Sequence, residues 1–275
     1  HSRHYSANLM TVAILGREGL DTLAQWAVPL FATVPDQKLP QPKFDVEPYP
    51  LSRLNNYYRI VPVKNFSSLT VTWALPPITE QVHSKPFRYV SHLLGHESEG
   101  SLLSLLKNKG WADQLMAGES RSHSDFACFD VTIELTDEAD AHVDEIIGLI
   151  FAYIRLIAAE PEPQRWVFDE MRDLASVSFR FRDVVEPSSL VMALAASLQL
   201  HPPKLAHSHP YLYDEWRPDL ISDLLMLMTP QRATVSHVSR VHESIATSRE
   251  RWYGTMYQRT PISDALLAHW SAVPL

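Results

Sequence analysis

Two histidines four residues apart are the side chains best placed for metal chemistry. His92 and His96 enclose the run His-Leu-Leu-Gly-His. On a helix this spacing puts both imidazoles on one face, as a zinc dyad requires. A catalytic zinc also needs a third ligand and a base for its bound water, and in the inverted motif H-x-x-E-H that base stands where this chain has Gly95. Glycine cannot accept a proton, so a pair of solvated or hydrogen-bonded histidines at a helix end is the plainer interpretation.

The other reactive groups do not complete a catalytic site. Cys128 is the only cysteine, which excludes an internal disulfide and a thiol-rich zinc site. It lies in an alternating strand pattern, so we predict a buried and inert thiol in a reducing compartment. The sequence contains no G-x-S-x-G elbow, Walker loop or dinucleotide fingerprint. We therefore expect this chain to hold no catalytic residue and no metal of its own.

Composition predicts an ordinary globular protein. Of the 275 residues, 45% are hydrophobic and 20% charged, and the net charge is −8 with no run of Lys or Arg. Nucleic acid and anionic membranes are thus unfavourable partners. No stretch approaches the ~18 apolar residues of a membrane span, and the first residues resemble neither a signal nor a transit peptide. These features favour a soluble, cytoplasmic protein.

The first 50 residues suggest two elements followed by a linker. Residues 9–15 are an apolar, partly β-branched run that predicts a buried strand. Residues 20–31 carry apolar side chains at three- and four-residue spacing, which predicts a helix that Pro29 should kink or end. Five prolines between residues 34 and 50 then exclude regular structure and indicate a linker.

The remaining elements predict an α+β fold, an antiparallel-rich sheet packed against helices. We expect residues 57–63 and 69–75 to form an antiparallel pair of strands, with further strands at 111–116, 126–135 and 233–238. Helices are expected at about 86–95 and 101–110, after Thr136, and from about Pro163, Ser188 and Pro218. Strands with segregated helices favour an α+β architecture over a doubly wound sheet.

Several blocks of sequence resemble the insulinase family of inverted-motif zinc peptidases. The longest runs from His92 to Trp111, with His-Leu-Leu-Gly-His-Glu at its start. Others agree in the same order along the whole chain: His1 to Met10, Leu15 to Glu18, Trp166 to Phe168, Phe179 to Phe181, Arg217 to Ile221 and Trp252 to Thr255. In this family the zinc helix lies in a first domain, and the second domain repeats its fold without the metal site. The resemblance therefore implies that residues 92–96 correspond to a degenerate zinc helix.

The resemblance also implies a division of the chain. Residues 1–50 would be the last strand and helix of a preceding catalytic domain plus a linker, and residues 51–275 a second, inactive domain with a C-terminal extension. The absence of an initiator Met fits a piece of a longer zinc metalloendopeptidase that hydrolyses short peptides. Zinc ligands would then lie outside this chain, and its partners would be peptide substrates, the catalytic domain and the C-terminal half.

Within the family, the second domain binds the amino terminus of a substrate at an exosite and pairs the substrate backbone with an edge strand. The matching positions are Gly95, Glu97, Leu115, Met116, Ala117, Gly118 and Glu119. A carboxylate and carbonyls can hold a terminal ammonium, and an edge strand offers sequence-independent hydrogen bonds. Four positions depart from the family: Ala117 and Glu119 replace Gly and Gln, and Arg88 and Ser91 replace His and Gly.

Two other functions stay open at this point. The chain could be a non-catalytic scaffold subunit related to the inactive partners of mitochondrial processing peptidase, which share the fold without zinc. It could also be a free-standing peptide-binding module. The blocks from Arg217 to Ile221 and from Trp252 to Thr255 favour the exosite domain of a peptidase.

Overall fold

The structure is a computed structural model that describes residues 4–44, 48–50, 53–64 and 66–274. The chain forms two compact units, one of residues 1–46 with 172–214 and one of residues 47–171 with 215–275. The boundary expected after residue 50 lies next to residues 51 and 52, which are outside the described ranges. The first three residues of the block from His1 to Met10 are outside these ranges too.

A seven-stranded mixed sheet forms the larger unit. Its order is β3-β4-β2-β5-β1-β7-β6, and β1 with β5 is the parallel pair among otherwise antiparallel neighbours. The strands are β1 (Asn56–Ile60), β2 (Ser67–Leu75), β3 (Ala112–Ser122), β4 (Ala127–Leu135), β5 (Ala233–Val238), β6 (Ser248–Arg249) and β7 (Met256–Pro261). The expected α+β fold with an antiparallel-rich sheet is confirmed.

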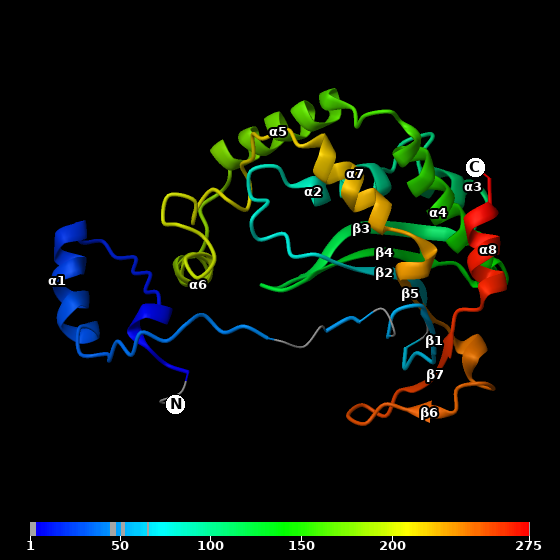
Figure 1. Cartoon of the computed structure of the whole chain (residues 1–275), viewed down its shortest axis with the longest axis horizontal. Helices are drawn as coiled ribbons and strands as arrows, with labels where there is room; N and C mark the ends of the chain where they lie inside the picture. The colour runs from blue at the N-terminus through cyan, green and yellow to red at the C-terminus, as the bar shows by residue number, and fades with distance from the viewer. Residues whose placement is uncertain (1–3, 45–47, 51–52, 65, 275) are drawn as a thin grey trace. The chain divides into compact units, whose positions relative to one another are not determined.

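Helices of this unit pack against the sheet and one another (Figure 1). They are α2 (Pro86–Leu94), α3 (Leu102–Asn108), α4 (Val143–Ala159), α7 (Pro218–Leu227) and α8 (Asp264–Ala272). Short 3-10 turns lie at Asp137–His142 (η3), Pro230–Arg232 (η4) and Arg240–His242 (η5). The long helix α5 (Arg165–Arg180) begins in this unit and ends in the other.

The core follows from period-two strands facing a period-3.6 helix. Alternate residues of β2 and β4 are fully buried, among them Trp73 and Phe129. On α4 the buried stripe consists of Val143, Ile146, Ile147, Ile150 and Ile154. Trp73 meets Phe151 edge to face at 5.8 Å, and its indole N–H donates to the Thr229 carbonyl at 3.1 Å. The polar residues between them lie on the other face, where the Thr70 and Thr132 hydroxyls are 3.1 Å apart.

The expected pairing of the first two strands of this sheet is wrong. β5 lies between β1 and β2, pairing parallel with β1 and antiparallel with β2. β5, which comes far later in the chain, therefore separates β1 from β2, which would have been neighbours in a hairpin. The sequence analysis also did not anticipate β6, β7 and α8, and it ended the sheet at residue 238.

Two other boundaries differ from expectation. The strand expected at residues 111–116 continues to Ser122 as β3. The helix expected directly after Thr136 begins at Val143, because the turn η3 comes first; the Thr136 hydroxyl bonds the Gly110 carbonyl at 2.7 Å instead of capping the turn.

The smaller unit contains η1 (Ala7–Leu9), α1 (Leu20–Phe31) and α6 (Pro187–Ser197). Helix α1 has the expected bounds, with Pro29 two residues before its end. The strand expected at residues 9–15 is wrong, since residues 10–15 have no regular structure and pair with no strand among the described residues. A strand needs a neighbouring strand for its backbone groups, and the contact that this segment makes with α6 comes from a side chain: the Thr11 hydroxyl donates to the Ala195 carbonyl at 2.9 Å.

Gly148 gives a stability prediction for the larger unit. It lies in the middle of α4, where Ala is normally favoured by about 1 kcal/mol. A Cβ here would be 2.5 Å from a methyl carbon of Val273, however. We expect Gly148→Ala to lower the free energy of unfolding by about 1–3 kcal/mol through overpacking. Adding Val273→Ala should restore most of the loss in urea unfolding; equal losses in the single and double variants would contradict this.

Candidate functional site

Strand β3 is an edge strand of the described sheet, with β4 as its partner on one side. The pairing is regular from Gln114 to Glu119, with Ala117 opposite Val131. Both backbone groups of Ala117 face α2: its carbonyl accepts the Ser91 hydroxyl, and its nitrogen lies 3.7 Å from where a Cβ on Gly95 would be. Backbone groups alternate in direction along an antiparallel strand, so Leu115 and Glu119 direct theirs to the same side. We call the outward backbone groups of Leu115, Ala117 and Glu119 the β3 edge.

Helix α2 meets the β3 edge with its small residues. Ser91 lies on α2, and Gly95 is the residue that ends it, four positions later. This spacing puts both on the side of the helix that faces β3. A Cβ on Gly95 would lie 3.0 Å from the Ser91 carbonyl oxygen and 3.9 Å from the Ala117 Cβ, so a side chain there would be tight. Pro86 opens the helix at its first turn, as expected. The sequence-predicted residues Gly95 and Ala117 are thus adjacent.

Charge is unevenly placed around the β3 edge. Glu97 comes two residues after Gly95 and is exposed, as is Glu119. Burial lowers the pKa of Lys85 to about 8; Arg88 acts in the same direction, and the Glu119 carboxylate opposes both. Cationic groups therefore lie near the Glu119 end of the edge, while the exposed Glu97 stands two residues after Gly95 in the sequence. Leu115 is buried and Met116 is half-exposed, so their side chains face opposite sides of the sheet.

His92 on α2 and His96, two residues after the helix ends, border a different surface. Their ring centroids are 5.5 Å apart, and both border a cavity of about 480 Å³ that Tyr89, Tyr153 and Trp166 also line. Burial lowers the pKa of His92, with His96 acting in the same direction and Glu170 opposing. Among the described residues, no group of three or more His, Cys, Asp or Glu side chains is placed to hold a metal ion.

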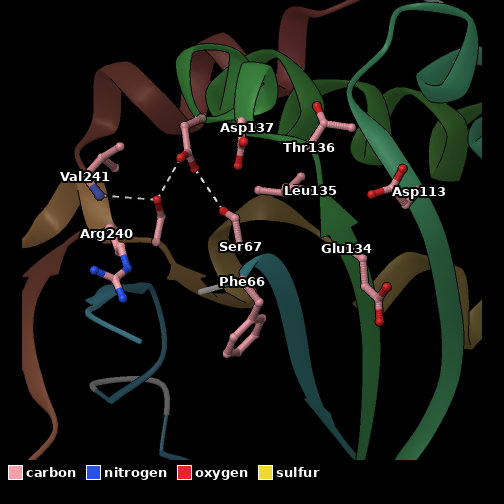
Figure 2. Close-up of a pocket in the computed structure, with 11 residues that line it drawn as sticks. Phe66, Ser67, Asp113, Glu134, Leu135, Thr136, Asp137, Arg240 and Val241 are labelled. Atoms are coloured by element: carbon pink, nitrogen blue, oxygen red, sulfur yellow. Dashed lines mark hydrogen bonds between the residues drawn. The ribbon is translucent and has the colours of Figure 1, made fainter. Parts of the chain in front are cut away.

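A second polar site lies at the end of β2 and β4 (Figure 2). Its cleft has a volume of about 660 Å³ and is lined by carboxylates of Asp113, Glu134, Asp137 and Asp140, with Arg240 at its side. Asp140 belongs to η3, and its carboxylate accepts hydrogen bonds from the Ser67 hydroxyl at 3.0 Å and the Ser239 hydroxyl at 2.7 Å. The cleft is therefore bordered by a carboxylate whose oxygens are already bonded.

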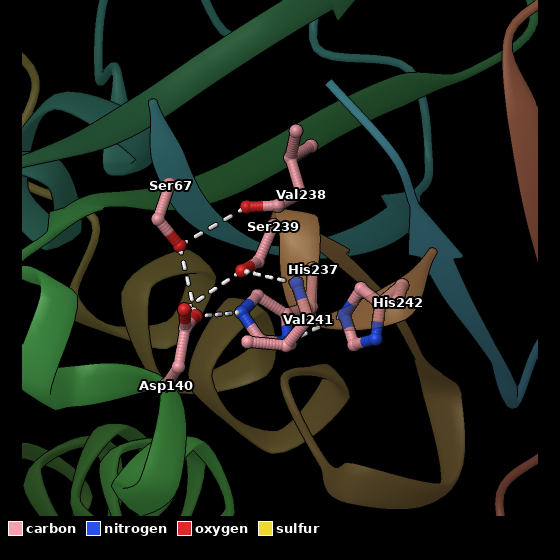
Figure 3. A network of polar contacts seen from close by, with 7 residues as sticks. All are labelled: Ser67, Asp140, His237, Val238, Ser239, Val241 and His242. Atoms are coloured by element: carbon pink, nitrogen blue, oxygen red, sulfur yellow. Dashed lines mark hydrogen bonds and ion pairs between the residues drawn. The ribbon is translucent and has the colours of Figure 1, made fainter. Parts of the chain in front are cut away.

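Two histidines extend this network into the core (Figure 3). His237 Nε2 lies 2.8 Å from Asp140 Oδ1, and His242 Nε2 lies 3.0 Å from His237 Nδ1. One proton per ring satisfies both contacts, with His242 donating to His237 and His237 donating to Asp140. Burial lowers the pKa of His237, against the Asp140 carboxylate, and burial and His237 together lower the pKa of His242 to about 4.

The network joins strand ends and has no arrangement for nucleophilic catalysis. Its serine hydroxyls donate to Asp140 and not to an imidazole, so no base activates them. It connects β2, η3, β5 and η5. Sequence analysis missed it, because Ser67, Asp140 and His237 are far apart in the chain and follow no motif. Cys128, by contrast, is buried as expected.

Family models identify the class of protein to which this fold belongs. The family description "Peptidase M16 inactive domain" matches residues 1–174, and "Middle or third domain of peptidase M16" matches residues 179–274. The chain therefore belongs to the M16, or insulinase, family of peptidases, as the sequence blocks indicated.

Curated relatives agree with this assignment. The chain is 39% identical to human insulin-degrading enzyme over 275 residues, which cover 100% of this chain and 27% of that protein. It is 32% identical to human nardilysin over 276 aligned positions, covering 98% of this chain and 24% of that protein. The chain thus spans about a quarter of the length of these relatives.

Solved structures share the fold. The crystal structure of pitrilysin matches with a TM-score of 0.88 at 21% identity, over 93% of this chain and 27% of that chain. A peptidase M16 inactive domain from Pseudomonas fluorescens matches with a TM-score of 0.55 at 14% identity, over 82% of this chain and 52% of that chain. Within the described ranges, no helix is both long and apolar enough to cross a membrane.

The histidine network predicts acid sensitivity. His237 and His242 have folded-state pKa values below the unfolded value of about 6.5. The folded state favours their neutral forms. Their contribution to the free energy of unfolding should therefore be fully present above pH 6.5 and should be lost as the pH drops toward 4. For His242 alone we expect a loss on the order of 2 kcal/mol between pH 7 and 4.5. Urea unfolding across this range measures it.

His242→Gln removes one titrating group from the network and should flatten the pH profile in that window. His269→Gln is the matched control, because His269 is an exposed histidine of α8. If the free energy of unfolding depends on pH as steeply in His242→Gln as in His269→Gln, the result would contradict the role of the network.

Proposed function

We propose that this chain is the substrate-binding, non-catalytic part of a zinc metalloendopeptidase that hydrolyses short peptides. In this function the β3 edge adds a peptide as a further strand, and Gly95 and Glu97 hold its amino terminus. The chain also forms part of the wall that encloses the substrate. The observation that carries the proposal is an edge strand whose outward backbone groups lie directly beside Gly95.

The geometry supports binding that depends little on sequence. Backbone groups of Leu115, Ala117 and Glu119 recur at every second residue, the spacing at which an antiparallel strand presents its own. Met116 and Gly118 alternate with these residues, and their backbone groups point the other way, toward β4. A peptide would therefore be recognised through its backbone along β3 and through its ammonium group at one end.

Charge supports one orientation. The exposed Glu97 carboxylate follows Gly95, whereas Lys85 and Arg88 lie toward Glu119. A terminal ammonium is favoured near the former and disfavoured near the latter. The residues proposed to bind are thus Gly95 and Glu97 for the ammonium and Leu115, Met116, Ala117, Gly118 and Glu119 for the extended backbone.

Zinc and the catalytic step belong, in this proposal, to the rest of the enzyme. His92 and His96 supply two imidazoles, no third ligand lies with them among the described residues, and Gly95 cannot act as the base. Residues 1–50 would be the end of the catalytic domain and a linker, and residues 51–275 the inactive domain. The relatives named insulin-degrading enzyme and nardilysin are about four times longer, which leaves room for these parts.

Glu97 gives the first test. A charge-assisted hydrogen bond contributes about 1.5–3 kcal/mol, so Glu97→Gln should weaken peptide binding about tenfold or more. Acetylating the peptide should have a similar effect, and the two changes together should cost no more than one, since both delete a single interaction. Fluorescence polarisation on the full-length protein, with its metal removed by a chelator, measures this.

Glu99→Gln is the matched control, because Glu99 is an exposed carboxylate two residues farther on. It should leave the affinity unchanged. Equal affinity of the wild-type protein for free and acetylated peptides would remove the amino-terminal assignment.

Metal content gives the second test. After dialysis, the 275-residue chain should retain no stoichiometric zinc and should not cleave an unstructured peptide. Elemental analysis and a fluorogenic peptide assay measure both. Bound zinc together with turnover that His92→Ala abolishes would contradict the proposal.

A further inference from the structure

Ser91 occupies a hydrogen-bonding group of the β3 edge. Its hydroxyl donates to the Ala117 carbonyl, the middle one of the three carbonyls that this edge directs outward. A Cβ on Gly118 would lie 2.9 Å from the Ser91 oxygen, so the hydroxyl is held closely between α2 and β3. Part of the edge is therefore satisfied from within the chain.

An added strand needs the same oxygen. When a peptide pairs with β3, one of its N–H groups must reach the Ala117 carbonyl, because that carbonyl faces away from β4. The peptide must share this oxygen with Ser91 or displace the serine hydroxyl, and each costs part of a hydrogen bond. Within the described part of the chain, no side chain donates to the outward carbonyls of Leu115 and Glu119 as Ser91 does to that of Ala117.

We propose that Ser91 is an affinity-determining residue of the β3 edge, where its hydroxyl competes with a bound peptide for the Ala117 carbonyl. This rests on the proposed function. The competition lowers the affinity for an extended backbone by part of one hydrogen bond. The cost is the same for a peptide with a free amino terminus and for an internal segment, so Ser91 sets the affinity of the edge and leaves the choice between them to the contacts at Gly95 and Glu97.

Removal of the hydroxyl tests the competition. In full-length protein with its metal removed by a chelator, Ser91→Ala should bind an unstructured fluorescent peptide about fivefold more tightly than the wild type. Ser222→Ala, the same change on α7, should leave the affinity unchanged. Ser91→Gly also frees the carbonyl and should give the same gain if Ser91→Ala does not fold.

Peptides with one backbone ester separate competition from a general effect on structure. An ester replaces one N–H by oxygen, so it removes a single donor from the peptide. At the position opposite Ala117, the ester should weaken binding to Ser91→Ala about fivefold and binding to the wild type less than about twofold. With that ester peptide, the gain from Ser91→Ala should disappear.

The outcomes distinguish this inference from the proposed function. Wild-type binding with no gain in Ser91→Ala, or a gain that persists with every ester peptide, overturns the competition and leaves the exosite standing. No binding by the wild type, Ser91→Ala or Ser91→Gly overturns both. A gain that one ester position removes supports the competition.

Discussion

An edge strand leaves every second N–H and C=O along one side without a ladder partner, and β3 is such a strand at the site end of this sheet. Those groups must bond to water, to other parts of the chain or to a ligand. Helix α2 answers this constraint at one point, through Ser91 on the Ala117 carbonyl. The close approach of α2 follows from the absence of side chains at Gly95 and Gly118. Protection of the edge and the proposed binding of a peptide thus involve the same backbone groups.

The rest of the larger unit fixes the position of that edge. β4 pairs with β3 on one side and β2 on the other, and its alternate residues are buried against the helices. At the far end of β2, Asp140 joins two serine hydroxyls and His237 in one network. Because buried polar groups cost free energy when unpaired, this network favours one arrangement of the strand ends.

Local patterns predicted much of this fold. Alternation gave β2 and β4, the apolar stripe gave α4, and proline at a first turn gave α2 and α7. The pairing of β1 with β2 failed, because β5 arrives between them from far along the chain, and no local pattern encodes that. The site positions Gly95, Glu97 and 115–119 came from family resemblance. The Ser91 contact depends on helix rotation and strand register together, which a single sequence does not specify.

Residue-resolved amide exchange by NMR tests the β3 edge most directly. Backbone N–H groups of Leu115, Ala117 and Glu119 point outward, and those of Met116 and Gly118 bond to β4. If a peptide adds to this edge as a strand, exchange at the first three positions should slow when a free-amino-terminus peptide binds. Exchange at Met116 and Gly118 should change little. Uniform slowing along β3, or protection confined to other elements, would contradict strand addition at this edge.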